Sequence, residues 1–334
     1  MPITTFFKNK RTLITGASGT IGSAVVKTLI KKNCKVIRAL TNDENGLYDL
    51  NNEIDDSFKD EITKKMKRKK VRYFLGDVRD YNRCLKSSKN VDIVIHVAAL
   101  KHVPICEYNT KEAYLTNVIG TKNMIKASIK NKVKRFIFIS TDKVINPTSL
   151  MGKTKLSAEN LILKNKDRNI KTKFSVIRFG NVFGSRGSVL LRFFDQIKGK
   201  KNITVTDTHM SRFFITIKKA VDSILEAVFL MKGGEIFIIK NMKAFKILDL
   251  AHALKKNMKK MNKIVFTGLR KGEKLYEELV TEKEKYYITE KKNFFIVEKK
   301  KKNEKNRFKV KNSNSTKHLN RQQISKFVKI NFGI

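Results

Sequence analysis

The stretch that decides the fold is TLITGASGTIG, residues 12–22, close to the start of the chain. Apolar and β-branched residues lead into Gly16, Gly19 and Gly22, and an amphipathic segment follows at 23–32. This order predicts a strand, a glycine turn and a helix. Such a turn brings backbone N–H groups to a helix start, where they can hold a pyrophosphate. The spacing is GxxGxxG rather than GxGxxG, so an ordinary tight turn is the alternative.

Further apolar, β-branched runs lie at 35–40, 71–75, 91–97, 135–140 and 174–179, with helical patterns between several of them. This alternation predicts a Rossmann-type α/β fold, a doubly wound parallel sheet with helices on both faces. The later pattern is less regular, and we expect strands at 203–205 and 235–239 and helices at 189–197, 217–231 and 247–258. We divide the chain into a dinucleotide-binding Rossmann domain at 1–180 and a smaller C-terminal lobe at 181–334 that mainly binds substrate. A part near 200–232 is expected to return to the first domain.

With 334 residues the chain can bury a large core. Its three cysteines, Cys34, Cys84 and Cys106, are odd in number and lack the spacing of a metal site. We therefore expect a reducing compartment, the cytoplasm, and no metal. The N-terminus lacks the apolar core of a signal peptide, and no apolar run approaches the ~20 residues that span a bilayer. Stable membrane insertion is not expected.

The net charge of +43 would ordinarily suggest a nucleic-acid or membrane partner. The lysines, however, are spread over nearly every predicted helix surface, as expected from a composition bias at solvated positions. The densest run, at 299–302 with Lys305 and Arg307, lies in a stretch that we predict to be a mobile internal loop. We expect no nucleic-acid partner.

The ends of the predicted strands carry residues that suit a dinucleotide. Asp77 follows the third strand, where a carboxylate could take the adenine amino group, and Ala98 and Ala99 follow the fourth, where small side chains leave room for ribose. The second strand ends without a carboxylate at its tip to hold a ribose 2′-hydroxyl, which favours NADP, with NAD as the alternative. The predicted cofactor residues are Gly16, Ser18, Gly19, Thr20, Ile21, Gly22, Thr41, Asn42, Asp77, Val78, Ala98, Ala99, Asn117 and Lys155.

An acid and a base follow the fifth strand directly. Asp142 and Lys143 lie at the carboxyl edge of the predicted sheet, where ligands of doubly wound folds bind. Burial and mutual charge can shift the pKa values of such a pair toward neutrality, which suits proton transfer, although an ordinary turn ion pair is the alternative. Met151 and Lys155 are four residues apart on a helix expected to start near Leu150, so they share one face. Lys155 is a candidate to hold the nicotinamide ribose.

The pattern Ser140-Thr141-Asp142-Lys143, followed by Met151 and Lys155, resembles the active site of a short-chain dehydrogenase whose usual tyrosine is replaced by methionine. Nearly the whole chain resembles the inverting UDP-N-acetylglucosamine 4,6-dehydratases, or CapD-like polysaccharide biosynthesis proteins, of the extended short-chain dehydrogenase/reductase family. The segments that carry the resemblance lie at 15–22, 74–80, 96–104, 140–143, 178–182, 184–189, 210–213 and 272–278. ALKHVP and GSRGSV within them are the most specific.

The resemblance implies a reaction without net redox change. NADP+ takes hydride from sugar C4, water leaves across C5 and C6, and hydride returns to C6, giving a UDP-4-keto-6-deoxy-L-hexose for surface polysaccharide or glycan biosynthesis. By resemblance Lys143 is the C5 base, Asp142 protonates the departing hydroxyl, and Thr141 bonds the C4 oxygen. A thioether cannot accept a proton, so Met151 leaves the base at C4 open. Lys143 is our expectation, with Lys155, Asp142 or a relayed water as alternatives.

The implied partner is a UDP-sugar, whose two phosphates suit guanidinium groups. Within the family segments we predict a substrate site formed by Lys101, Asn181, Arg186, Ser188, Arg212, Arg270 and Glu273. Lys271 stands where relatives usually have proline, so the loop there departs from the family pattern. Relatives also suggest a homo-oligomer such as a hexamer.

Two other functions stay open at this stage. A UDP-hexose 4-epimerase uses the same scaffold and cofactor without elimination, although Lys143 beside Asp142 argues against it. A non-catalytic dinucleotide-binding regulator or basic adaptor is favoured by Met151 and by the high positive charge, but the complete substrate pattern argues against it.

Overall fold

A computed structural model describes residues 3–56, 69–167, 170–298 and 312–334. Its centre is a nine-stranded sheet with the order β13-β14-β10-β6-β5-β4-β1-β2-β3. The strands are β1 (Arg11–Thr15), β2 (Val36–Thr41), β3 (Val71–Leu75), β4 (Ile93–His96), β5 (Arg135–Ile139), β6 (Lys173–Arg178), β10 (Ile236–Ile239), β13 (Ile288–Glu290) and β14 (Phe294–Val297). All pairs from β3 to β10 are parallel, and only those that β14 makes are antiparallel. The predicted Rossmann-type sheet is confirmed.

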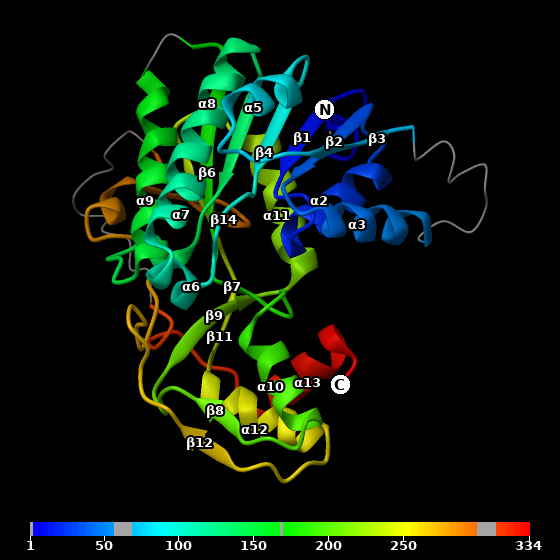
Figure 1. Ribbon diagram of the computed structural model, residues 1–334. Coiled ribbons are helices and arrows are strands. Elements are labelled where there is room, and N and C mark those ends of the chain that lie inside the picture. The colour runs from blue at the N-terminus through cyan, green and yellow to red at the C-terminus, as the bar shows by residue number, and fades with distance from the viewer. Residues whose placement is uncertain (1–2, 57–68, 168–169, 299–311) are drawn as a thin grey trace.

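Helices cover both faces of this sheet (Figure 1). One face carries α2 (Thr20–Lys31), α3 (Glu44–Asp56) and α11 (Ile217–Leu230). The other carries α5 (Tyr81–Ser88), α8 (Gly120–Lys130) and α9 (Leu150–Leu163). Shorter elements are α1 (Ile3–Phe6), α6 (Val103–Tyr108), α7 (Thr110–Tyr114), a π-helical turn at Leu115–Ile119 and 3-10 turns at Asp142–Val144, Lys164–Asp167 and Glu284–Tyr287.

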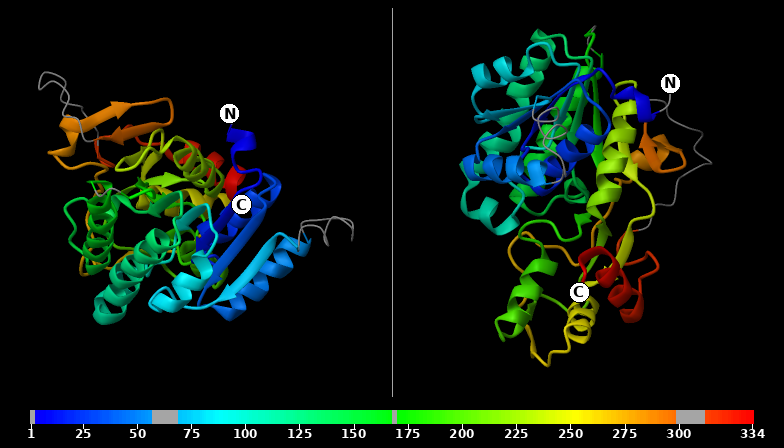
Figure 2. Two further views of the ribbon diagram at one scale, coloured as in Figure 1. Left: turned by 90° about the horizontal axis from the view of Figure 1, so that it is seen from above. Right: turned by 90° about the vertical axis from the view of Figure 1, so that its right-hand side faces the viewer.

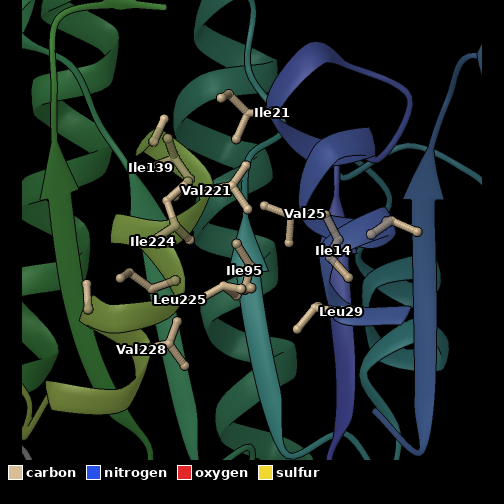
Figure 3. Packing of buried hydrophobic residues seen from close by; sticks show 14 of the residues in the cluster. Ile14, Ile21, Val25, Leu29, Ile95, Ile139, Val221, Ile224, Leu225 and Val228 are labelled. Atoms are coloured by element: carbon tan, nitrogen blue, oxygen red, sulfur yellow. The ribbon is translucent and has the colours of Figure 1, made fainter. Parts of the chain in front are cut away.

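The strands bury both of their faces because neighbouring side chains point to opposite sides of a pleated sheet. On β4, Ile95 packs in the layer with α2 and α11, whereas Val94 packs with α8 and α9. Figure 3 shows α2 and α11 side by side over the first layer, with Val25 and Val221 facing each other across Ile95. A strand made of consecutive apolar residues therefore indicates a sheet that is covered by helices on both faces.

A second body lies beyond the carboxyl ends of the parallel strands (Figures 1 and 2). It contains α10 (Val189–Lys198), β8 (Ile203–Val205), α12 (Ile247–Asn257), β12 (Ile264–Phe266) and α13 (Arg321–Phe332). A three-stranded sheet of β7 (Asn181–Val182), β9 (Ser211–Ile215) and β11 (Lys243–Lys246) joins it to the large sheet. This lobe has its own apolar cluster, in which the rings of Phe214 and Phe245 stack 4.2 Å apart.

Strands and helices that the sequence predicts after residue 180 are found close to their expected bounds. The part that rejoins the large sheet begins at α11, not near 200, and continues with β10, β13 and β14. β9, β11 and α13 were not predicted, and the two strands are runs of only four or five residues that carry little periodic signal. The predicted basic loop at 299–307 lies outside the described residues.

A buried ion cluster ties β6 to α9 and to the turn before β13. The Arg178 guanidinium at the end of β6 donates to both carboxylate oxygens of Glu159 on α9, at 3.1 Å each, and to Glu284, at 2.8 and 2.9 Å. Glu159 also accepts from Ser140 Oγ at 2.8 Å, immediately before the Asp142 turn. Burial alone would lower the pKa of Arg178, but these carboxylates hold it well above its usual value. The cluster therefore fixes the ends of β5 and β6 relative to each other.

Replacing Arg178 by methionine should lower the free energy of unfolding by about 3 to 5 kcal/mol, because it leaves two carboxylates without their buried counter-ion. Chemical denaturation followed by circular dichroism measures the loss. Lys218→Met, which removes an exposed pair with Asp222 on α11, is the matched control and should change stability little. A loss below about 1 kcal/mol for Arg178→Met would contradict a structural role for the cluster.

Candidate active site

Two adjoining cavities open where the parallel strands end. The larger, of about 720 Å³, follows the ends of β1 to β6, and the smaller, of about 220 Å³, lies between the sheet and the lobe. Residues that line both cavities are Lys143, Asn181, Gly187, Ser188 and Val189. Lys143 therefore stands at the junction of the two spaces, and a ligand in either one reaches its amine.

The glycine turn after β1 is closely packed against the end of β4. Gly16 has a φ of +63°, and a Cβ there would lie 2.8 Å from the Ala98 Cα. A Cβ on Gly22 would lie 2.1 Å from the Gly16 carbonyl oxygen. Thr15 Oγ1 accepts from the Val97 and Ala98 backbone N–H groups, at 3.2 Å each. The turn and the start of α2, which line the larger cavity, thus fit a pyrophosphate.

Most predicted cofactor residues line the larger cavity. They are Gly16, Ser18, Gly19, Thr20, Ile21, Thr41, Asn42, Asp77, Val78, Ala98, Ala99 and Lys155. Gly22 does not line this cavity; its lack of a side chain allows the turn to pack closely. Asn117 is buried and bonds both backbone groups of Leu100, at 2.8 and 3.1 Å, so it shapes the cavity wall from behind. Asp77 already pairs with Arg79 at 2.7 Å.

The predicted substrate residues separate into two groups. Arg212, Arg270 and Glu273 line the smaller cavity, whereas Lys101 and Arg186 line the larger one. Asn181 and Ser188 line both.

Arg186 belongs to the loop at 184–188, which crosses the cofactor side of the cleft. Its backbone N–H donates to Thr20 Oγ1 at 3.0 Å, and its carbonyl oxygen accepts from Lys101 Nζ at 2.7 Å. The guanidinium lies 3.8 Å from the Asp43 carboxylate, near the end of β2. Burial and the charge of Arg186 lower the pKa of Lys101. Two cations beside a helix N-terminus favour an anionic group there.

The acid and base that follow β5 form a buried network. Asp142 is fully buried, and its Oδ1 accepts from Lys143 Nζ at 3.0 Å and from Thr141 Oγ1 at 2.9 Å. Lys143 Nζ also donates to Asn181 Oδ1 at 3.0 Å and lies 3.4 Å from Glu277 Oε1.

Burial raises the pKa of Asp142, and the charge of Glu277 adds to this shift. Burial alone would lower the pKa of Lys143, but Asp142 and Glu277 outweigh it and hold the value above its usual range. The resting pair thus consists of a charged ammonium and a carboxyl group whose pKa is raised by burial.

Met151 and Lys155 share a face of α9, as the sequence predicts. Met151 packs against Cys106 and Ala113 and offers no group that can accept a proton. The Lys155 amine donates to the Ile139 carbonyl and lies 4.0 Å from the centre of the Phe138 ring. Burial lowers the pKa of Lys155 to about 7, with Glu159 opposing the shift. Lys155 therefore exchanges its proton near neutral pH.

The comparison with protein families agrees with this geometry. Residues 12–299 match the family described as "Polysaccharide biosynthesis protein". The chain belongs to this family. The resemblance expected from the sequence is thereby confirmed.

Similar proteins of this family carry several names. An uncharacterized membrane protein of Methanocaldococcus jannaschii is 43% identical, over 98% of this chain and 97% of its own length. An inverting UDP-N-acetylglucosamine 4,6-dehydratase of Campylobacter jejuni is 40% identical, over 84% of this chain and 80% of its own length. A UDP-glucose 4-epimerase of Rickettsia bellii is 39% identical, over 83% and 80%. The X-ray structure of Pen from Bacillus thuringiensis matches with a TM-score of 0.87 and 38% identity, over 97% of this chain and 98% of that one.

One of these relatives is called a membrane protein. Among the described residues of this chain, no helix combines the length and the apolar character needed to cross a bilayer.

Sequence reasoning missed the residues that reach the site from the far end of the chain. Glu277 was part of a quoted family segment, but nothing in its spacing indicated a contact with Lys143, 134 positions away. Lys274 and Arg192 also line the smaller cavity. An unusually dense mixture of Glu and Lys around 273–278 was the only available signal, and in so lysine-rich a chain it is weak.

Arg186→Gln should weaken dinucleotide binding about tenfold, the effect of losing about one charge-assisted contact. Affinity for UDP should change less than about twofold, because the guanidinium lies on the other side of Lys143 from the smaller cavity. Isothermal titration calorimetry with NADP+ and with UDP measures both. A larger loss of affinity for UDP than for NADP+ would instead assign Arg186 to the substrate phosphates.

Proposed function

We propose that this protein is a UDP-N-acetylglucosamine 4,6-dehydratase that inverts C5 and forms a UDP-4-keto-6-deoxy-L-hexose for surface polysaccharide or glycan biosynthesis. The observation that carries the proposal is the Lys143–Asp142 hydrogen bond of 3.0 Å at the junction of the two cavities. The amine is thereby available to one bound sugar, and the acid lies directly behind it, fully buried and hydrogen-bonded to it. The named activity of the Campylobacter jejuni relative supports the same reaction.

A dinucleotide in the larger cavity would supply the redox chemistry, by taking hydride from sugar C4 and returning it to C6. The turn at Gly16 and the start of α2 would hold its pyrophosphate, and Ala98 would leave room for its ribose. Arg186 favours NADP over NAD, since its guanidinium lies 3.8 Å from Asp43 near the end of β2, where such a group suits a 2′-phosphate.

One proton transfer would prepare the pair for elimination. The Lys143 ammonium can pass its proton along its hydrogen bond to Asp142, whose pKa is raised by burial. The result is a neutral amine that can take the C5 proton and a protonated acid that can release the C6 hydroxyl as water. Both roles expected from the sequence then follow from a single transfer.

The base for the C4 hydroxyl is a separate question, and here Lys155 is the better candidate than Lys143. Lys143 already serves as the C5 base in this scheme, whereas burial brings the pKa of Lys155 to about 7 and leaves its amine for C4. A general base is most effective when its pKa is near the working pH. We therefore assign the C4 proton to Lys155, directly or through a hydroxyl or water next to it.

The smaller cavity suits the substrate diphosphate. Arg270 and Arg192 both line it, and burial and the charge of Arg270 lower the pKa of Arg192. An anion between these guanidinium groups would relieve their repulsion. Arg212 has less freedom, because it donates to the backbone carbonyls of Ser211, Lys274 and Leu275. We assign Arg192 and Arg270 to the phosphates and Arg212 to the shape of the cavity.

A UDP-hexose 4-epimerase is the second candidate, because the Rickettsia bellii relative carries that name at 39% identity. Epimerisation needs only C4 chemistry and would leave the Asp142–Lys143 pair without a task.

Incubation of the purified protein with UDP-N-acetylglucosamine and NADP+ in deuterated water tests the proposal. A dehydratase gives a product that has lost one water and carries deuterium at C5, as seen by mass spectrometry and NMR. Lys143→Met should abolish both changes while UDP still binds. A product of unchanged mass would establish the epimerase instead, and absence of turnover with every UDP-hexose would favour a regulator.

The rate of turnover should rise with pH through about 7 and level off above it, because Lys155, with a pKa of about 7, accepts a proton only when neutral. Below that pH its ammonium cannot serve as a base. Lys155→Arg keeps the positive charge but cannot lose its proton near neutral pH. It should cut kcat by about 100-fold or more at saturating cofactor. A wild-type kcat that stays flat from pH 6 to 8 would rule out this assignment.

A further inference from the structure

The carboxylate of Glu277 reaches the catalytic pair from outside the Rossmann sheet. It is buried, with a side chain that is 3% exposed, and its Oε1 lies 3.4 Å from Lys143 Nζ. The amine of Lys143 therefore lies between two carboxylates, those of Asp142 and Glu277. We propose that Glu277 is a positioning residue for Lys143, which holds the ammonium at the cavity junction and controls when it releases its proton. The role in turnover rests on the proposed function.

Positive groups from separate elements face Glu277. Arg212 Nε on β9 lies 3.7 Å from Oε1, and Lys274 Nζ lies 3.6 Å from Oε2. Within the described residues Oε2 has no hydrogen-bond partner, although it is buried. Most buried polar groups have a hydrogen-bond partner, so an unpartnered buried oxygen calls for an explanation. This carboxylate divides its charge among three cations, so a change at one of them alters its hold on Lys143.

The backbone around Glu277 is fixed on both sides. Its N–H donates to Ser313 Oγ at 2.9 Å, and its carbonyl accepts from the Ser313 N–H at 2.8 Å. Two residues later, the Leu279 carbonyl accepts from Arg178 at 3.5 Å, and Arg178 also binds Glu284. The buried Arg178 cluster thus anchors the segment that carries Glu277, and the carboxylate is held in place before any ligand arrives.

The groups that face Lys143 define the electrostatic consequence. Asp142 and Glu277 stabilise its charged form, while burial and Arg212 on β9 oppose it. Asp142 lies next to Lys143 in the chain and must also accept its proton, so it cannot serve only as a fixed counter-ion. Glu277 can serve as a fixed counter-ion. Burial alone would raise its pKa, but Lys143, Arg212 and Lys274 keep that pKa below the usual value. Removing Glu277 should therefore release the lysine proton at lower pH.

The test measures the titration of Lys143 directly. Competitive acetylation at a series of pH values, with mass spectrometry of the peptide that contains Lys143, reports the neutral fraction of this amine without any substrate. Glu277→Gln should lower its pKa by about one unit or more, which is about a tenfold gain in neutral amine at a fixed pH below the pKa. Glu277→Asp keeps the charge with a shorter reach and should restore part of the shift.

Glu278→Gln is the matched control. It removes the same charge from the neighbouring residue, which bonds Asn146 at 2.9 Å and does not contact Lys143, and should leave the titration unchanged. Lys274→Met gives a second test that does not touch Glu277 and guards against a variant that fails to fold. It removes a competing cation, so the Lys143 pKa should rise.

An unchanged Lys143 titration in folded Glu277→Gln, or equal shifts in Glu277→Gln and Glu278→Gln, would overturn the proposal. Turnover adds an independent measurement. Glu277→Gln should lower kcat about 10-fold or more, with KM for the UDP-sugar changed less than about threefold, since a displaced amine impairs chemistry more than binding. If the labelling shift is found without turnover of any UDP-hexose, the role of Glu277 stands and the proposed function fails.

Discussion

The arrangement of this site depends on keeping one ammonium group, that of Lys143, charged and in place at the end of a buried strand. Desolvation disfavours such a charge strongly unless partners lie within a few ångströms. Asp142 supplies one partner from the adjacent position, and Glu277 supplies the other from the C-terminal half of the chain. Because Lys143 lines both cavities, the same contacts that stabilise the charge also connect the two binding spaces.

The sheet and the lobe meet at this group and through apolar side chains of β9 and β11, since Phe213 and Ala244 pack in the same cluster as β5 and β6. The large sheet contributes the turn after β5, the three-stranded sheet contributes β9 with Arg212, and the segment before β13 contributes Glu277. The loop at 184–188 adds a third connection, since it links Thr20 on the cofactor side to Ser188 at the cavity junction. A ligand in either cavity therefore contacts residues whose positions depend on contacts made at the other cavity.

Much of the site could be predicted from local sequence. The glycines at 16, 19 and 22, the short side chains of Ala98 and Ala99, and the pair at 142 and 143 all lie at strand ends, and parallel strand ends converge on one edge. The contacts of Arg186 with the cofactor side and of Glu277 with Lys143 could not be predicted, because they join segments more than 100 residues apart. Arg186, which the sequence assigned to the substrate, lines the larger cavity together with Lys101.

The sequence by itself determined the doubly wound sheet and its family, because continuous runs of apolar residues place apolar side chains on both faces of a sheet, and both faces are then buried only between layers of helices. It also determined which side chains stand at the carboxyl ends of the strands. Only the tertiary structure decided which of those groups carries a proton. The pKa of a buried side chain is set by its burial and by charges within a few ångströms. For Lys143 these charges include Glu277, from a distant part of the chain, and for Lys155 the main effect is burial.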